Sequence, residues 1–279
     1  MSGEPVSAVA APDSPAPRLI LASTSPSRRA ILTGAHIRHE VCPSRVDEDA
    51  VLAAAEREAE QALSLPEQVS VLAHAKALDV AARLGAELAA PAVRGPHTAN
   101  RPATSLIPDT SPIPATAAAP APDTPPAPGA ATDVPALLIL GCDSLFELDG
   151  QALGKPHTPE RARERLRQMA GRTGLLHTGH CLVSVNAAGE IAGVEQVARV
   201  ASVVVAELSD TDIEAYIATG EPLQVAGSFT LEGYGGPFIE RIEGDHHTVL
   251  GLSLVALRAL LAQAGVAITD LWEPSPDPR

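Results

Sequence analysis

The sequence is poor in aromatic residues, which make up 2% of its 279 positions: one Trp, two Tyr and three Phe. It also lacks an excess of positive charge, because 34 acidic residues outnumber 20 Lys and Arg and give a net charge of -14. Such a chain repels a nucleic-acid backbone, so we expect no DNA or RNA polymer as a partner. A local basic pocket could still hold a small phosphorylated ligand.

Cysteine is scarce as well, and its spacing excludes two classes of small protein. Cys42, Cys142 and Cys181 lie far apart without a C-x-x-C pair, so neither a zinc ribbon nor a disulfide framework is indicated. No stretch approaches the roughly 20 apolar residues of a membrane span, and the N-terminus lacks the basic start and apolar core of a signal peptide. We therefore expect a cytoplasmic protein with no membrane contact.

The composition changes sharply in the middle of the chain. Twelve of the 26 prolines fall within residues 89–135, mixed with alanine and threonine, which is typical of a disordered segment. Long surface insertions cost little loop-closure entropy, about 0.6 kcal/mol for each doubling of length. We expect a single domain over residues 18–272 interrupted by this insertion, with tails at 1–17 and 273–279.

Short apolar strands alternate with amphipathic helices outside the insertion. Helices are predicted for three segments with capping residues or helical periodicity, at 69–84, 158–171 and 209–220. Strands are predicted for four apolar or β-branched segments, at 137–141, 177–185, 197–205 and 238–242. The alternation predicts an α/β fold with a mixed sheet and flanking helices.

The stretch "LILASTSPSRRAIL" near the N-terminus predicts a strand that leads directly into a helix, with Ser25 as N-cap and Pro26 at the first helical position. Free backbone N–H groups of a first helical turn favour an anion. Ser23 and Arg28 add donors at the same junction. The alternative is a simple capping serine beside a solvated arginine.

The stretch "LLILGCDSLFELDGQALGKP" predicts a strand, a hairpin turn at Asp149-Gly150 and a return toward Lys155. Asp143 follows the apolar part of that strand, where its carboxylate could coordinate a divalent metal or take a proton from water. Lys155 could approach a phosphate across the hairpin. A capping or turn role for Asp143 is the alternative.

Eight stretches in a fixed order resemble the motifs of the Maf family, also called septum formation proteins. They are "LILASTSPSRRAIL", "HE" followed by "VDED", "LAHAKA", "GCDS", "LDGQALGKP", "GRTGLLHTG", "AGSFTLEGYGGPFIERIEGD" and "VLGLSLVALRALL". The resemblance implies a Maf-like (inosine-triphosphatase-like) fold with two lobes around a cleft, and a homodimer. It also implies a nucleoside triphosphate pyrophosphatase, a hydrolase of acid anhydrides that releases a monophosphate and pyrophosphate with Mg²⁺ or Mn²⁺.

The resemblance gives roles to individual residues. Phosphate binding is assigned to four side chains: Ser23, Arg28, Lys76 and Lys155. Asp143 matches the proton acceptor that activates the attacking water, and removing such a base typically costs about 10² to 10⁴ in rate. Asp143 is also a predicted metal ligand together with Glu40, because Mg²⁺ prefers carboxylates and substrate phosphates. A plain surface charge is the alternative for Glu40.

The positions that set base preference depart from the patterns of the family. Ser27 replaces the arginine or tryptophan of two subfamilies, and Ser144 replaces threonine or glutamine. Glu232 resembles the subfamily that acts on 7-methylguanosine triphosphate. A small residue at position 27 should leave the base pocket open, so we expect a broad or unusual base preference.

Two functions of different class remain. The first is a metal-dependent pyrophosphatase that removes non-standard or surplus nucleotides, and the second is a nucleotide-binding regulator of septum formation with little turnover. The joint presence of Asp143, Lys76, Lys155 and Arg28 favours catalysis, because a sensor needs no water-activating carboxylate. We interpret the adjacent His246 and His247 as loop residues that are poorly placed to bind one metal together.

Overall fold

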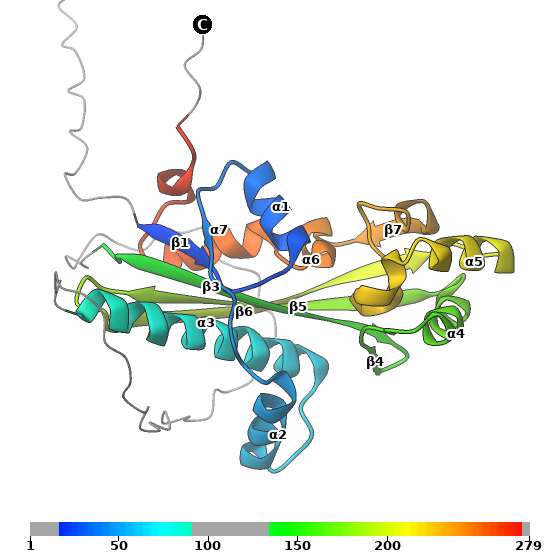
Figure 1. Cartoon of the computed structure of the whole chain (residues 1–279), viewed down its shortest axis with the longest axis horizontal. Helices are drawn as coiled ribbons and strands as arrows, with labels where there is room; N and C mark the ends of the chain where they lie inside the picture. The colour runs from blue at the N-terminus through cyan, green and yellow to red at the C-terminus, as the bar shows by residue number, and fades with distance from the viewer. Residues whose placement is uncertain (1–16, 91–133, 275–279) are drawn as a thin grey trace, which may run out of the picture.

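A seven-stranded mixed sheet runs through the protein in the computed structural model, which describes residues 17–90 and 134–274 (Figure 1). The strand order is β2-β1-β3-β5-β6-β7, and β4 pairs with the far end of β3. The strands are β1 (Arg18–Leu21), β2 (Glu40–Val41), β3 (Leu137–Leu148), β4 (Gln151–Leu153), β5 (Thr173–Val185), β6 (Ile191–Val205) and β7 (Ile239–Glu243). The predicted insertion and tails lie almost wholly outside the described residues, so the predicted domain limits stay a prediction.

The sheet confirms the mixed α/β prediction. β1 runs parallel to both β2 and β3, whereas β3, β5, β6 and β7 are successively antiparallel. The three central strands are longer than the sequence predicted, at 12, 13 and 15 residues. Polar residues such as Asp143 and Ser144 interrupt the apolar pattern of β3, yet pairing with β5 continues through them.

Helices cover both faces of the sheet and its far end (Figure 1). They are α1 (Pro26–Gly34), α2 (Glu48–Ala59), α3 (Leu65–Ala89), α4 (Pro159–Met169), α5 (Asp210–Ala218), α6 (His246–Leu250) and α7 (Leu254–Gln263). α3 lies along one face, α1, α6 and α7 lie on the other, and α4 and α5 sit together at the far end of the long strands. Within the described residues, no helix is long and apolar enough to cross a membrane.

Side chains of alternate residues build two separate cores on the two faces, as strand geometry requires. Leu19, Leu21 and Leu140 pack with α1 and α7, whereas Ile20 and Ile139 pack with α3. All five are at most 1% exposed, and burying such a side chain contributes about 1.5–3 kcal/mol. The two cores fix the register of β1 against β3, which places the residues that follow β1.

Small residues let α3 lie very close to the sheet. A Cβ atom on Gly141 would overlap the carbonyl oxygen of Ala73, and one on Gly179 would overlap the carbonyl of Val69. Glycine at these two strand positions therefore allows backbone to approach backbone. The close contact brings Lys76 of α3 beside the strand residue Asp143.

Candidate active site

The edge of β3 is open over a short interval between two paired segments. β1 pairs with residues 137–140 and β4 pairs with residues 146–148. Residues 141–145 pair with neither of these two strands. On the other edge, β5 pairs with β3 from residue 137 to residue 147, so the open interval is held in place. Asp143 and Ser144 lie in this interval and point to opposite faces of the sheet.

The junction that follows β1 lies beside this open edge and has the predicted form. Ser25 is the N-cap of α1, its side chain accepts a hydrogen bond from the backbone N–H of Arg28, and Pro26 occupies the first helical turn. Ser23 Oγ accepts a hydrogen bond from the backbone N–H of Ser25 at 3.2 Å. The strand-to-helix prediction is confirmed.

The guanidinium of Arg28 connects this junction to three other segments. Nε donates to the carbonyl of Gly251 at 2.7 Å, and Nη1 donates to Cys142 O at 2.8 Å and Ser23 Oγ at 3.2 Å. Nη2 donates to Ser144 Oγ at 3.1 Å. These bonds use four of the five N–H groups of a guanidinium and leave one on Nη2 for a ligand. Arg28 is 9% exposed, so it is not a solvated surface arginine.

The Ser144 hydroxyl continues the network toward the carboxyl-terminal part of the chain. It lies 2.9 Å from Thr178 Oγ1, which donates to the carbonyl of Thr248 at 2.8 Å. Gly251, the residue after α6, has a φ of 96°. A Cβ at this position would lie 3.2 Å from both Arg28 Nε and Ser144 Oγ, which is a tight contact. Ser144 thus helps to fix Arg28.

On the α3 face of the sheet, one ammonium joins two carboxylates. Lys76 Nζ lies 2.6 Å from Asp143 Oδ1 and 2.6 Å from Glu48 Oε1. Lys76 and Asp143 are 8% and 7% exposed, while the Glu48 side chain is 54% exposed. The site therefore has a buried inner pair and an outer carboxylate that solvent and ligands can reach.

The environment of Asp143 shifts its titration. Burial raises the pKa of the Asp143 carboxyl, and the nearby Lys76 and Arg28 oppose that shift without cancelling it. Oδ2 of Asp143 accepts no hydrogen bond from the described residues. A buried carboxylate with a raised pKa and a free oxygen is suited to accept a proton from water.

The structure does not bring Glu40 to this site. Glu40 forms a bidentate pair with Arg18, at 2.8 and 2.7 Å, and both side chains are 56% exposed. Glu40 aligns with Ile20 and hence with Ile139, four residues or about 13 Å along β3 from Asp143. Glu48, which the sequence analysis did not single out, takes the second carboxylate position. Its signal was the "VDED" stretch, where Asp47 caps α2 and Glu48 is the first helical residue.

Lys155 is exposed on the segment that follows β4. Leu153 pairs with Phe146, so the chain beyond it runs back along the open interval of β3 toward Ser144. The predicted turn at Asp149-Gly150 is confirmed, with φ of 50° and 76° at the two positions. That Lys155 faces a ligand at the open edge stays a prediction.

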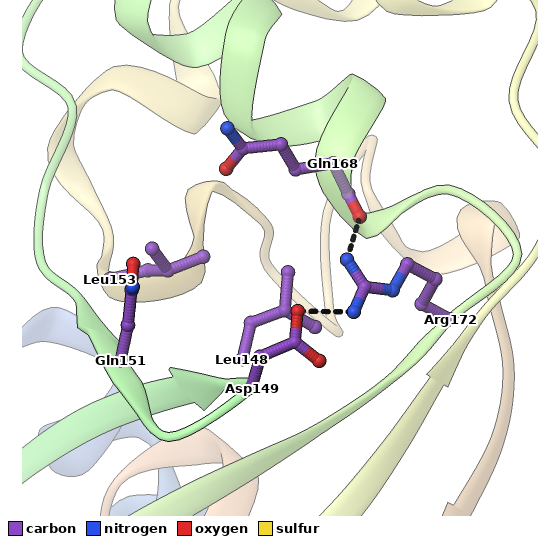
Figure 2. Close-up of a pocket in the computed structure, with 6 residues that line it drawn as sticks. All are labelled: Leu148, Asp149, Gln151, Leu153, Gln168 and Arg172. Carbon is purple, nitrogen blue, oxygen red and sulfur yellow. Dashed lines mark hydrogen bonds and ion pairs between the residues drawn. The ribbon is translucent and has the colours of Figure 1, made fainter.

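The hairpin of β3 and β4, which precedes Lys155, is anchored to the neighbouring elements (Figure 2). Arg172 pairs with Asp149 at the turn and donates to the carbonyl of Gln168 at 3.3 Å. These three residues line a cavity of about 270 Å³ with Leu148 and Leu153. None of the predicted phosphate-binding residues lines this cavity. We therefore do not regard it as the nucleotide site, and we interpret the Arg172 contacts as holding the hairpin in place.

We call the Arg28 guanidinium and its bonded partners Ser23, Cys142, Ser144 and Gly251 the Arg28 corner. The three predicted specificity residues differ in how they relate to it. Ser27 is half-buried in the first turn of α1, next to Arg28. Glu232 is exposed and lies close enough to His247 to raise the pKa of that imidazole, although burial makes the net shift downward. Ser144, the third, bonds to Arg28 directly.

The interpretation of His246 and His247 as loop residues is wrong. Both lie in the first turn of α6, with ring centroids 3.9 Å apart, and their nitrogens and the Asp245 carboxylate all lie within 4.8 Å of one another. Asp245 is the N-cap of α6: Oδ1 accepts from the His247 N–H and Oδ2 from the Thr248 hydroxyl. The two imidazoles are thus closer together than the prediction that they diverge implied. The capping role of Asp245 accounts for its place in this cluster.

Taken together, the fold and the site define a mixed α/β protein that presents a fixed arginine, serine hydroxyls and a carboxylate–lysine cluster at one open strand edge. This donor set is suited to a phosphorylated ligand. A sequence profile described as Maf-like protein matches residues 18–264, and the chain belongs to the Maf-like family.

Several relatives are similar over nearly the whole chain. A nucleoside triphosphate pyrophosphatase of Leifsonia xyli subsp. xyli is 44% identical over 255 residues, which cover 91% of this chain and 96% of the relative. One of Streptomyces coelicolor is 41% identical over 265 residues, covering 94% and 98%. A nucleoside triphosphate pyrophosphatase/Nudix hydrolase fusion protein of Bifidobacterium longum is 40% identical over 292 residues, covering 91% of this chain and 60% of the fusion.

Proposed function

We propose that this protein is a nucleoside triphosphate pyrophosphatase that hydrolyses a triphosphate to the monophosphate and pyrophosphate. The observation that carries the proposal is the pairing of buried Asp143 with Lys76, beside the Arg28 corner, at the open edge of β3. The names of the similar proteins support the same reaction.

Each residue of the site has a part in the proposed reaction. Arg28, Ser23 and Lys155 bind and orient the phosphate chain, and Lys76 neutralises negative charge that builds up near Asp143. Asp143 takes a proton from the attacking water on its free Oδ2. The new bond joins the water oxygen to the α-phosphorus, and pyrophosphate leaves with the bridging oxygen.

We infer that a divalent cation, Mg²⁺ or Mn²⁺, is held by Asp143 and Glu48. Their carboxylates fit this role because Asp143 Oδ1 and Glu48 Oε1 converge on one cation already, the Lys76 ammonium, at 2.6 Å each. Oxygen ligands are those that Mg²⁺ and Mn²⁺ prefer, together with substrate phosphates. When bound, the metal neutralises phosphate charge. The Asp245, His246 and His247 cluster has a softer donor set and is less suited to Mg²⁺.

We further propose a broad or unusual base preference, action as a homodimer in the cytoplasm, and a role in removing surplus or modified nucleotides. The size of Ser27 supports the first of these, because serine is smaller than the arginine or tryptophan of the two subfamilies at this position; Ser144 bonds to Arg28. A nucleotide-binding regulator of septum formation with little turnover is the alternative.

A panel assay tests the proposal. Purified protein is incubated with Mg²⁺ and a set of standard and modified nucleoside triphosphates, and pyrophosphate is separated from orthophosphate. We expect monophosphate and pyrophosphate from the wild type and loss of both in Asp143→Asn. Tight nucleotide binding without turnover across the panel would favour the regulator instead.

A further inference from the structure

Residues 230–235 fold around a single carboxylate, that of Glu221. Oε1 accepts hydrogen bonds from the Tyr216 hydroxyl at 2.9 Å, the Thr230 hydroxyl at 2.5 Å and the Gly235 N–H at 3.0 Å. Oε2 accepts from the Tyr234 N–H at 2.9 Å. Two backbone and two side-chain donors therefore meet at one acidic group, which lies just before the loop that it organises.

The four hydrogen-bond donors around Glu221 favour its ionised carboxylate over the protonated form. Burial alone would raise the pKa of Glu221, but hydrogen bonds from Thr230, Tyr234, Gly235 and Tyr216 lower it below its usual range. All four partners are donors, and a charged acceptor forms the stronger hydrogen bond. A neutral amide at this position has only one acceptor oxygen, so its NH₂ group would face at least one donor, such as the Tyr234 N–H, that now bonds to the carboxylate.

The glycines of "GYGG" fit the same arrangement. A Cβ on Gly233 would overlap the Glu221 carboxylate, and one on Gly235 would overlap the Tyr216 hydroxyl. Neither overlap can be relieved without moving the carboxylate or the hydroxyl that hold the loop. The loop thus requires Glu221 as its centre and small residues around it.

The loop carries Glu232 and lies near the start of α6, the helix that leads to the Gly251 carbonyl bound by Arg28. Glu232 sits between the two anchored positions Thr230 and Tyr234, and its charge acts on His247 at the start of α6. The same helix ends at Gly251, whose carbonyl binds Arg28. A shift of residues 230–235 would therefore move Glu232 relative to the proposed nucleotide site.

We propose that Glu221 is a positioning residue that fixes the 230–235 loop and thereby sets base selectivity through Glu232. This inference rests on the proposed function of the site. Glu221 lies outside the residues that bind phosphate, so its replacement should change which base is accepted more than how fast bound substrate reacts.

Amide hydrogen exchange tests the loop directly, without turnover. In Glu221→Gln we expect the N–H groups of Tyr234 and Gly235 to exchange at least about tenfold faster, as loss of roughly one hydrogen bond predicts. Glu214→Gln is the matched control, because Glu214 lies on α5 and pairs with Arg163 away from the loop. Thr230→Val removes one donor and keeps the carboxylate, so it serves if Glu221→Gln does not fold.

Kinetics with purine and pyrimidine triphosphates test selectivity. In the Glu221 and Thr230 variants, we expect KM to rise about tenfold, kcat to change less than about threefold, and the kcat/KM ratio between the two bases to shift about fivefold. Unchanged exchange, or a lower melting temperature with an unchanged selectivity ratio, would overturn the inference. If the wild type binds triphosphates without turnover, the proposed function fails, and the same ratio is read from dissociation constants.

Discussion

Lys76 Nζ lies 2.6 Å from Asp143 Oδ1, and the two side chains, 67 positions apart in the chain, are both buried. Breaking a buried ion pair by removing one partner typically costs about 3–5 kcal/mol, because the other charge is left unpaired. The intact pair nevertheless adds little net stability, because both charges lose their hydration when they are buried. Its position at an unpaired strand edge, where a ligand can approach, indicates that the charge is kept for chemistry.

The pH dependence of activity should report Asp143. Its pKa is raised by burial, so the ionised base becomes more abundant as pH increases through that raised value, and kcat/KM should rise with it. Lys76 lowers the pKa of Asp143, so Lys76→Met should move the acidic limb of the profile to higher pH. Profiles of kcat/KM against pH for the two proteins make the comparison. A limb at the same pH in both would show that a different group titrates.

Glu48 and Glu40 provide a matched pair for the metal site. Glu48 shares Lys76 with Asp143, whereas Glu40 is bound to Arg18 on the exposed edge of the sheet. We expect Glu48→Gln to raise the Mg²⁺ concentration needed for half-maximal activity by about tenfold or more, as loss of a carboxylate ligand from a hard-cation site implies. Glu40→Gln should leave it within about twofold. Titration of activity with Mg²⁺ measures both effects. A larger effect of Glu40→Gln than of Glu48→Gln would show that Glu40, and not Glu48, is the metal ligand.

The sequence predicted the elements that depend on local signals. Ser25 and Pro26 mark the start of α1, and Asp149-Gly150 marks the hairpin, because capping and turn geometry depend on neighbouring residues. The resemblance to the Maf family also placed Lys76 and Asp143 in one site, where the structure finds them in contact.

The parts that the sequence missed depend on contacts between distant segments. β3 continues through Asp143 and Ser144 because β5 supplies eleven paired positions, which outweigh an interrupted apolar pattern. The "VDED" stretch predicts an acidic helix start at Glu48, but only the packing of α2 against α3 brings Glu48 and not Glu40 to Lys76. Glu221 gives no sign in the sequence that four donors from two segments meet at its carboxylate.

Arg28 should not tolerate lysine. Its guanidinium satisfies Gly251 O, Cys142 O and two serine hydroxyls, and a single ammonium cannot reach all of these acceptors. We expect Arg28→Lys to lower the free energy of unfolding by about 1–3 kcal/mol and to raise KM for the triphosphate. Arg29→Lys, at the exposed neighbouring position, is the control. Urea unfolding and steady-state kinetics give the two quantities, and a variant equal to Arg29→Lys in both would remove Arg28 from the site.

His180 should make the fold sensitive to mild acid. Its Nε2 accepts a hydrogen bond from the Ser253 N–H at 2.9 Å, and Nδ1 lies 3.3 Å from the carbonyl of Val197, so the ring fits as the neutral form with the proton on Nδ1. Burial lowers the pKa of His180 from 6.5 to about 4. Ser253 is two residues from Gly251, which binds Arg28.

The sign of the effect follows from the depressed pKa. Between pH 6.5 and about 4 the unfolded chain binds a proton at His180 that the folded chain does not, so stability is present above this window and is lost as pH falls through it. The full loss amounts to about 3 kcal/mol. His180→Gln can keep an acceptor for Ser253 but does not titrate, so it should be less stable at pH 7 and lose less stability on acidification. Urea unfolding of both proteins at pH 7 and pH 4.5 measures the difference, and parallel losses would assign the acid sensitivity to other groups.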